Sequence, residues 1–520
     1  MKNSWLIGVI ILLGASTGYS QNEGTLTFMN SLPQTNDNNP SAIPKYSFSF
    51  GLPASSVMAY YANNGFSYND VISKQPDGTV NADLTKLNSK IKPKNYITQA
   101  LAVDLLRLGL RVHKQFYLTL NAQAKTYNRL MLPKDLLGIF INGNAPVAGA
   151  TGTTTLSMSP KAESLTYLQT SIGAAYSPTS ALTFGARIKY LKGLENVTTQ
   201  NSSFNLTTDN STYALTATAG MDVRTSGIYN FTQSGYSFKL NDYLKNNGFA
   251  LDLGATYKVT PKLTVAASII DLGSINWKNN TYGYSLDPSK AKYNFQGVDL
   301  SQIIKSNNNY LQAQGDSIQK NFKVQQAPIG SYRTPIPAHM YVNGSYTLNR
   351  QLTLAAVLFS EIFKGRMSTG ITVGANKHFG SILSLAGSYT VSNNSYNNIG
   401  AGVSLNLTPV QLFMVGDNLL RIPFSGGNLN TFANSTQFFN VRVGMNFVFG
   451  WDKKHDIKGD PTAEQFQTKN GKQAVSTGVS GGDFQTKKGK SIAKNTAKAS
   501  DFKKKGRKKN KKKPQPKTDS

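Results

Sequence analysis

Six basic residues in the 520-residue chain lie on the polar side of segments in which apolar and polar residues alternate. Successive side chains of a strand point to opposite faces, so these cations and their apolar neighbours would face opposite ways. Cations gathered on one polar face would attract anionic solutes. Alternatively, they pair with acids such as Asp37 or Asp135, because an unpaired buried charge is costly. The six cations are Arg107, Arg111, Arg187, Lys189, Lys258 and Arg442.

Residue groupings typical of enzymes are missing from the sequence. The four histidines do not stand at metal-ligand spacing with another histidine or an acid. G-x-S-x-G, the signature of a nucleophilic serine on a sharp strand-to-helix turn, matches only residues 14–18 and 478–482, and neither match lies between a patterned strand and a helix. The chain has no cysteine, so disulfides and thiolate metal sites are excluded. The sequence predicts a non-enzyme that needs neither metal nor cofactor.

The cations belong to a pattern of period two that extends from residue 44 to residue 450. Many of its segments run nine to twelve residues, and roughly ten tilted residues span the hydrocarbon layer of a membrane. Their polar faces are rich in Gly, Ser, Thr and Asn, and only 16% of all residues are charged. We therefore predict an all-β fold: a transmembrane antiparallel β-barrel of about 14–16 strands, with its apolar face toward lipid. A soluble β-sandwich is the alternative, with the apolar face inward.

The expected turns between strands are short on one side of the sheet. "TPK" at Thr260 and "TP" at Thr408 are short turns, whereas residues 279–335 and 417–437 form long connections. In outer-membrane barrels the short turns face the periplasm. The last patterned strand, which ends at Phe449, then finishes on the periplasmic side, and we expect both termini there.

The N-terminal region predicts export to the outer membrane of a Gram-negative cell. Lys2 precedes the apolar run "WLIGVIILLGA", and small residues follow before Gln21, so residues 1–20 are typical of a signal peptide. Residues 21–43 have no period, and we expect them to form a small plug in the barrel or a disordered lead-in. "LPKDLLGIFINGNAP" from Leu132 indicates a short helix.

The C-terminal residues 451–520 differ from the rest in charge. They contain 20 Lys and Arg against 7 Asp and Glu, and too few apolar residues to form a core. Such a composition predicts a disordered periplasmic tail. The tail is either a solvated linker or a tether to peptidoglycan or to periplasmic or secretion-complex proteins. Because of the export signal we expect no nucleic acid as partner.

Five stretches in order resemble a family of Bacteroidetes outer-membrane barrels of unassigned function, over about residues 21–449. They are "NPSAIPKYSFSFGLP", "NNGFSYNDVI", "DLLRLGLRV", "LPKDLLGIFINGN" and "RIKYLKGLENVTT". The stretches are also similar to barrels of the fatty-acid-transporter type, whose N-terminal hatch carries an Asn-Pro-Ala motif. Asn39, Pro40 and Ser41 stand at the corresponding place, with Ser for Ala. A second similarity is to barrels that accompany type IX secretion.

Two functions remain open at this stage. The first is a passive transporter or channel for small lipidic or anionic solutes. The alternative is a non-catalytic scaffold of the envelope or of a secretion system, whose basic tail contacts its partners. Outer-membrane lipids are the expected surroundings in both cases.

Overall fold

A computed structural model describes residues 23–64, 72–74, 79–144, 151–237, 239, 241, 244–295, 316–392, 395–419 and 438–450. The predicted signal peptide and the predicted tail lie outside these residues. Among the described residues, no helix is both long and apolar enough to cross a bilayer.

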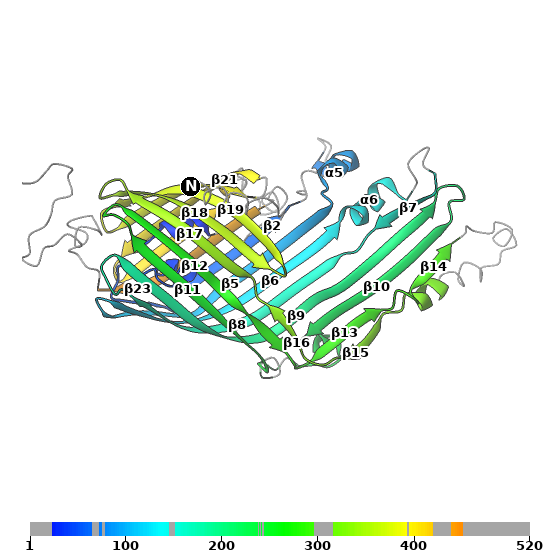
Figure 1. The fold of residues 1–520 in the computed structure, drawn as a ribbon, viewed down its shortest axis with the longest axis horizontal. Helices are drawn as coiled ribbons and strands as arrows, with labels where there is room; N and C mark the ends of the chain where they lie inside the picture. The colour runs from blue at the N-terminus through cyan, green and yellow to red at the C-terminus, as the bar shows by residue number, and fades with distance from the viewer. Residues whose placement is uncertain are drawn as a thin grey trace, which may run out of the picture. The chain divides into compact units, whose positions relative to one another are not determined.

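The described strands close into an antiparallel barrel of fourteen strands (Figure 1). Closure occurs where the last strand pairs with the first, in the register Phe48 with Phe449 and Val57 with Val443. The ring consists of β1 (Phe48–Gly51) continued by β2 (Ser56–Asn63), then β5 (Lys94–His113), β6 (Phe116–Pro133), β8 (Lys161–Tyr176), β9 (Leu182–Asp209), β11 (Asn246–Lys258), β12 (Leu263–Trp277), β17 (Ala338–Thr347), β18 (Leu352–Phe363), β19 (Arg366–Phe379), β20 (Leu383–Ser392), β21 (Ser395–Leu407), β22 (Val410–Asp417) and β23 (Phe438–Phe449).

The first barrel strand is interrupted at residues 52–55. Pro53 there has no N–H to donate to a ladder, and Ala54 has a φ of 61°. β1 and β2 nevertheless each pair with β5 on one side and with β23 on the other, so together they form a single strand of the barrel.

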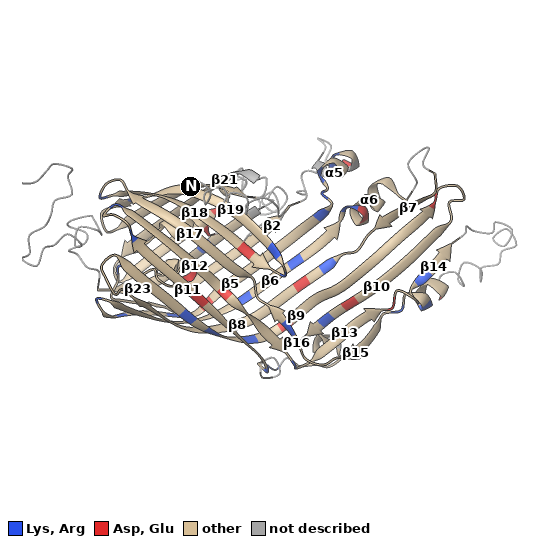
Figure 2. Cartoon of the chain, viewed as in Figure 1, with Lys and Arg blue, Asp and Glu red and all other residues tan. Residues whose placement is uncertain are grey.

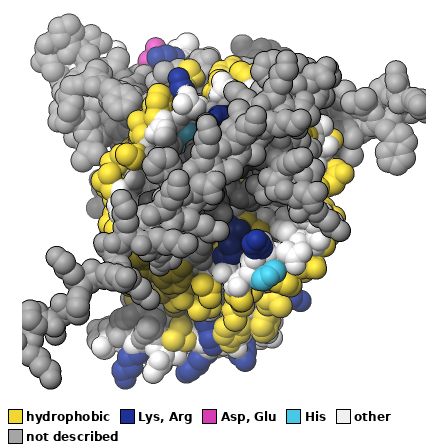
Figure 3. Space-filling view, turned by 90° about the vertical axis from the view of Figure 1, so that its left-hand side faces the viewer, with side chains coloured by type: hydrophobic (Ala, Val, Ile, Leu, Met, Phe, Trp, Pro, Cys, Tyr) yellow, Lys and Arg dark blue, Asp and Glu magenta, His cyan; other side chains and the backbone are white. Residues whose placement is uncertain are grey.

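The apolar side chains of the strands point outward, as the alternation predicts. Ile188 is 66% exposed on the outer wall, whereas the neighbouring Arg187 is 2% exposed and points inward. β23 shows the same alternation, with Val443 on the outside and Arg442 inside. Viewed from the end with short turns, hydrophobic side chains line the outside of the barrel and Lys and Arg gather at its lower rim (Figure 3). This arrangement confirms a membrane-type barrel and excludes the sandwich.

Except for the two-residue turn between β18 and β19, the described short turns leave the same end of the barrel. They connect β5 to β6, β8 to β9, β11 to β12, β17 to β18, β19 to β20 and β21 to β22, by two to five residues each. Longer connections leave the other end and carry β3 (Ile72–Lys74), β4 (Val80–Ala82), α5 (Leu84–Lys90), α6 (Lys134–Asn142) and a 3-10 helix (Tyr229–Thr232). The helix predicted from Leu132 is α6.

Beyond the end with long connections the sheet continues past the barrel. β9 has 28 residues: its first part pairs with β11 and its second part with β10 (Leu215–Ser226). We call the added strands the extended sheet; Figure 1 shows it at the right. It comprises β10, β13 (Thr281–Leu286), β14 (Lys292–Phe295), β15 (Gln325–Pro328) and β7 (Thr153–Ser157).

Apolar side chains are buried in three clusters inside the described barrel, two that include plug residues and one near the end with long connections. Residues 23–43, which we call the plug, include α2 (Gly24–Phe28) and α3 (Thr35–Asn38), and bury Leu26 and Met29 against Phe413 of β22. Near the end with long connections, Trp277 and Ile336 form a buried cluster with other apolar side chains, the roof. Ile336 follows β16 (Tyr332–Pro335), which pairs with the end of β12. The polar interior lies between plug and roof.

Candidate functional site

A connected network of ten ionised side chains, between plug and roof, joins the plug to the barrel wall. Each member lies within 4.0 Å of an opposite charge in the network. Figure 2 shows Lys and Arg interspersed with Asp and Glu along neighbouring strands. We call this network the ionic belt. Its members are Glu23, Asp37, Asp104, Arg107, Lys125, Arg187, Lys189, Asp252, Asp271 and Arg442.

Irregularities in two strands bring wall acids into the belt. Asp104 and Arg107 are three residues apart, so a regular strand would point them to opposite faces. A register shift between Asp104 and Leu106 places both side chains inside the barrel. Asp271 sits in a similar bulge of β12 with a φ of 60°, and its N–H donates to Asp252 Oδ1 at 2.8 Å. β-bulges of this kind re-aim side chains.

Asp37 of the plug lies at the centre of three arginines from three different strands. Arg107 donates to both of its carboxylate oxygens, at 3.0 and 2.7 Å, and Arg442 Nη1 donates at 3.2 Å. Arg187 Nη1 lies 4.0 Å away. Burial raises the pKa of the Asp37 carboxyl, but Arg107 and Arg442 outweigh this effect and hold the pKa well below its usual range. Asp37 therefore stays ionised.

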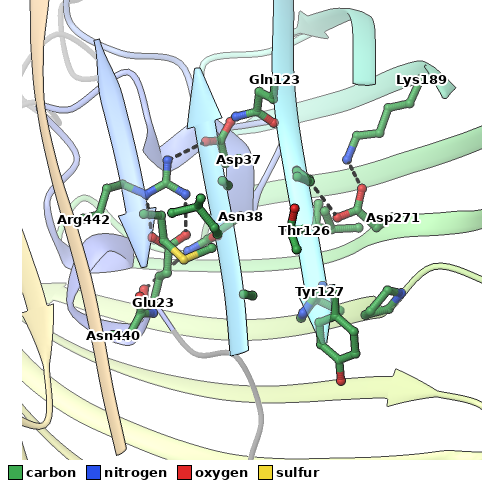
Figure 4. A pocket seen from close by; sticks show the side chains of 18 of the residues that line it. Glu23, Asp37, Asn38, Gln123, Thr126, Tyr127, Lys189, Asp271, Asn440 and Arg442 are labelled. Atoms are coloured by element: carbon green, nitrogen blue, oxygen red, sulfur yellow. Dashed lines mark hydrogen bonds and ion pairs between the residues drawn. The ribbon is translucent and has the colours of Figure 1, made fainter. Parts of the chain in front are cut away.

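Arg442 depends on the plug for both of its carboxylate partners among the described residues. Its Nε and Nη2 donate to Glu23 at 2.6 and 2.9 Å, and its Nη1 reaches Asp37 (Figure 4). On the wall it contacts Ser56 Oγ, at 3.3 Å. The other two arginines keep a wall acid: Arg107 Nε donates to Asp104 at 2.7 Å, and Arg187 lies 3.3 Å from Asp252.

The remaining wall members continue the belt away from the plug. Lys189 lies 2.7 Å from Asp252 and also contacts Asp271. Asp271 in turn lies 3.3 Å from Lys125. Because removing one partner of a buried pair costs about 3–5 kcal/mol, each member of this chain depends on its neighbours.

Further side-chain hydrogen bonds fix the rest of the plug. The hydroxyl of Thr25 donates to Asp417 Oδ1 at 2.6 Å and lies 2.6 Å from that of Ser388. Gln34 and Asn446 exchange two amide hydrogen bonds of 2.8 and 3.0 Å.

The Asn39-Pro40-Ser41 motif lies against two glycines of the wall. Ser41 donates from its N–H and its hydroxyl to Asn39 Oδ1, at 2.9 and 2.7 Å. A Cβ on Gly185 would lie 2.2 Å from the Pro40 carbonyl carbon, and one on Gly254 would lie 2.1 Å from Asn39 Oδ1. The motif is therefore a compact turn that lies directly against the wall, at two positions where a side chain would collide with it.

A small polar cavity lies beside the plug, and Figure 4 shows its lining. Its volume is about 90 Å³, and its lining includes Asp37, Lys189, Asp271 and Arg442. Toward the roof, Glu361 accepts from Arg129 at 2.6 Å and from the Tyr127 hydroxyl at 3.2 Å. This cavity offers room for several waters or one small ion.

The structure separates the six predicted cations into two groups. Arg107, Arg187, Lys189 and Arg442 belong to the belt. Arg111 instead donates to the backbone oxygen of Pro44 at 2.6 Å, and Lys258 is half-buried outside the belt.

Of the two acids proposed as partners, Asp37 pairs with the arginines and Asp135 does not. Asp135 accepts from the Ser157 N–H at 2.8 Å in a connection outside the barrel, so its expected pairing with a lumen cation was wrong. Sequence reasoning missed Glu23, Asp104, Lys125 and Asp271. The odd spacing of Asp104 and Arg107 was a usable sign of a bulge.

The closed wall, apolar exterior and plugged polar interior define the class of protein: an outer-membrane-type antiparallel β-barrel. Within that class the chain belongs to a family of unknown function (DUF5723), whose model matches residues 40–417. No curated protein matches the sequence.

Solved structures similar to the chain are also membrane barrels. A FadL homologue of Pseudomonas aeruginosa has a TM-score of 0.37 at 11% identity, covering 84% of this chain and 97% of the other. The toluene transporter TodX of Pseudomonas putida has a TM-score of 0.37 at 10% identity, covering 84% and 96%. The translocator domain of the autotransporter NalP from Neisseria meningitidis has a TM-score of 0.31 at 8% identity, covering 84% and 100%. Identities and scores this low support no inference about what crosses this barrel.

Proposed function

We propose that this protein is a passive outer-membrane channel for small anionic solutes, and that the plug closes it in the conformation described here. The export signal and the sided turns of the sequence favour a barrel with its short turns and both termini in the periplasm. A solute would then pass along the polar interior once the plug moves aside.

One observation carries this proposal, the charge balance of the ionic belt. With the plug in place, five cations face five acids, so the belt is neutral. Glu23 and Asp37 belong to the plug, and the three other acids belong to the wall. When the plug leaves, the wall retains five cations and three acids, a net charge of +2. A hydrated bore with this charge favours anions over cations and over lipidic solutes.

The way the plug is attached supports its movement. Its polar bonds to the wall are ion pairs and hydrogen bonds, which water can replace when the interior hydrates. Its apolar contacts, such as those of Leu26 and Met29 with Phe413, must also break as it moves. The carboxylates of Glu23 and Asp37 also occupy the positions that an anionic solute would take on Arg107 and Arg442.

Conductance in planar bilayers tests the proposal. The double variant Glu23→Gln with Asp37→Asn removes both plug acids, each of which makes charged hydrogen bonds worth about 1.5–3 kcal/mol. Because about 1.4 kcal/mol is tenfold in an equilibrium, we expect the open probability to rise at least tenfold over the native protein. The open pore should prefer anions in a KCl gradient.

A disulfide tether provides the matched control. The hydroxyls of Thr25 and Ser388 are 2.6 Å apart, and the chain has no cysteine of its own. Thr25→Cys with Ser388→Cys, added to the double variant, should close the pore under oxidation and reopen it with a reductant. A folded double variant that never conducts would contradict the proposal.

The second candidate function is a structural barrel of the envelope or of a secretion complex. The buried roof, the small cavity and the extended sheet beyond the barrel favour it. In this role the basic residues 451–520 would bind peptidoglycan or a periplasmic protein. Truncation after Gly450 should then abolish co-sedimentation with peptidoglycan, whereas conductance would not change.

A further inference from the structure

The three arginines around Asp37 offer more hydrogen-bond donors than one carboxylate uses. Arg107 forms a two-pronged pair with Asp37, and Arg442 adds one bond at 3.2 Å. Arg187 approaches only to 4.0 Å and makes no direct hydrogen bond to that carboxylate. The Nε of Arg187 has no hydrogen-bond partner in the described structure although the side chain is 2% exposed. A larger anion with more oxygens would engage all three.

Wall acids hold two of the three arginines in the absence of the plug. Asp104 accepts from Arg107 Nε at 2.7 Å, and Asp252 lies 3.3 Å from Arg187. Arg107 faces Asp104 with its Nε, and its Nη1, which donates to Asp37, is released when the plug leaves. Arg187 faces both Asp252 and Asp37 with its Nη1. Arg442 keeps its contact with Ser56. Two of the three arginines are therefore held by wall acids before any ligand arrives, which lowers the cost of binding.

Geometry and charge together select the class of ligand. Arginine forks match the oxygens of phosphate as well as those of carboxylate. A tetrahedral oxyanion has four oxygens for three guanidinium groups, and a dianion neutralises the net +2 that the belt retains when the plug leaves. A monocarboxylate or chloride would satisfy neither requirement.

We infer that Arg107, Arg187 and Arg442 form a binding site for a tetrahedral dianion, namely phosphate or the phosphate group of a small monoester. This ligand competes with Asp37 for the same guanidinium groups, so its binding favours release of the plug. The inference rests on the proposed function for the route by which the ligand arrives, and it adds the identity of the solute.

Binding of inorganic phosphate to the purified full-length protein in detergent tests the site directly. At pH 8, where phosphate is mainly a dianion, calorimetric titration of the Glu23→Gln, Asp37→Asn variant should show binding at least tenfold tighter than that of the native protein. Chloride and acetate should not compete at equal concentration. Glycerol 3-phosphate serves as the second arm, because it binds equally well only if the site accepts a monoester.

The Arg442→Gln change, added to that variant, should weaken phosphate binding at least tenfold. Lys258→Gln is the matched control, because Lys258 is an interior cation outside the belt, and it should leave binding unchanged. If the double variant does not fold, Asp37→Asn alone replaces it. It should still bind phosphate more tightly than the native protein does, and Arg442→Gln should still weaken that binding.

The outcomes separate this inference from the channel itself. Phosphate binding no tighter than chloride binding, or equal losses in Arg442→Gln and Lys258→Gln, would overturn the inference. A pore that conducts anions with no preference for phosphate leaves the proposed function standing and removes the dianion site. Phosphate binding to a barrel that never conducts retains the site and rejects the channel.

Discussion

Gly185 of β9 decides how closely the plug can approach the barrel wall. A Cβ at this position would lie 2.2 Å from both the Pro40 carbonyl carbon and the Ser41 nitrogen, whereas ordinary contacts begin at 3.4 Å. Both obstructing atoms are backbone atoms, so no side-chain rotation relieves the clash. The Gly185→Ala change therefore forces the plug to withdraw by roughly 1 Å, typical of overpacking that costs about 1–3 kcal/mol.

Withdrawal also weakens the bonds of the motif to Thr256. The hydroxyls of Ser41 and Thr256 are 2.7 Å apart, and Asn39 Nδ2 donates to the Thr256 hydroxyl oxygen at 3.3 Å. Neutral hydrogen bonds contribute about 1 kcal/mol each. The free energy that favours the docked plug should then fall by about 2–4 kcal/mol, and the population of undocked states should rise by roughly 30-fold to 1,000-fold.

Hydrogen–deuterium exchange of plug peptides measures this loss, because exchange follows local opening. Residues 24–41 should exchange faster in the Gly185→Ala protein by roughly the same factor, with the barrel strands unchanged. Gly344→Ala is the control, since a Cβ on Gly344 meets nothing within 4 Å. Equal plug exchange in the two variants would refute the steric reasoning.

Three further predictions concern the wall, the belt and the roof. Ile188→Lys places a charge on the outer face of the barrel, where Ile188 is 66% exposed. Near the bilayer midplane this change should lower the free energy of unfolding in liposomes by about 2–4 kcal/mol. Phe140→Lys on α6, outside the barrel, is the control and should change the free energy of unfolding little. The stabilisation from ionised Asp37 is fully present above its unfolded pKa of 3.8 and is lost as the pH falls through its lower folded pKa. Plug exchange, corrected for its intrinsic rate, should therefore rise as the pH falls below 4, and Asp37→Asn should reduce that rise. Glu361→Gln removes the carboxylate that lies 2.6 Å from Arg129, and it should lower the free energy of unfolding in denaturant by about 3–5 kcal/mol. Asp222→Asn, at an exposed ion pair, is the control. An equal loss in the two variants would show that an unpaired Arg129 near the roof costs little.

Alternation in the sequence was sufficient to predict the barrel, because each face of a strand meets a different solvent. Ile188 and Arg187 are neighbours in sequence, and the structure places them on opposite sides of the wall. The number of strands could not be read in the same way. β1 and β2 form one interrupted strand, and β10 and β11 follow one another along β9, so a count of patterned segments overestimates the ring.

The extended sheet escaped prediction for a related reason. Strands outside the barrel have the same period of two as strands within it, and the period does not distinguish lipid from water. β9 continues through 28 residues, and the strict alternation of its first part gives way to mostly half-buried residues in its second part.

Only part of the belt could be predicted from the sequence. Arg107 and Arg442 follow the period and were placed inside, but Asp104 and Asp271 depend on bulges that shift the period by one residue. Glu23 belongs to a segment without any period, so no pattern assigns its side chain a direction. The partners of the cations were therefore harder to predict than the cations themselves.

The distribution of acids between plug and wall links the folding of the barrel to its closure. A net +2 in a dry interior would be very costly, because an isolated buried charge loses its hydration. The wall alone therefore requires water, anions or the two plug acids, and the plug supplies Glu23 and Asp37 from within the same chain. It follows that deleting residues 23–43 should not yield an empty dry barrel. The deleted protein should instead retain a hydrated interior that takes up anions, and its stability should increase with phosphate concentration, whereas the native protein should show little such dependence.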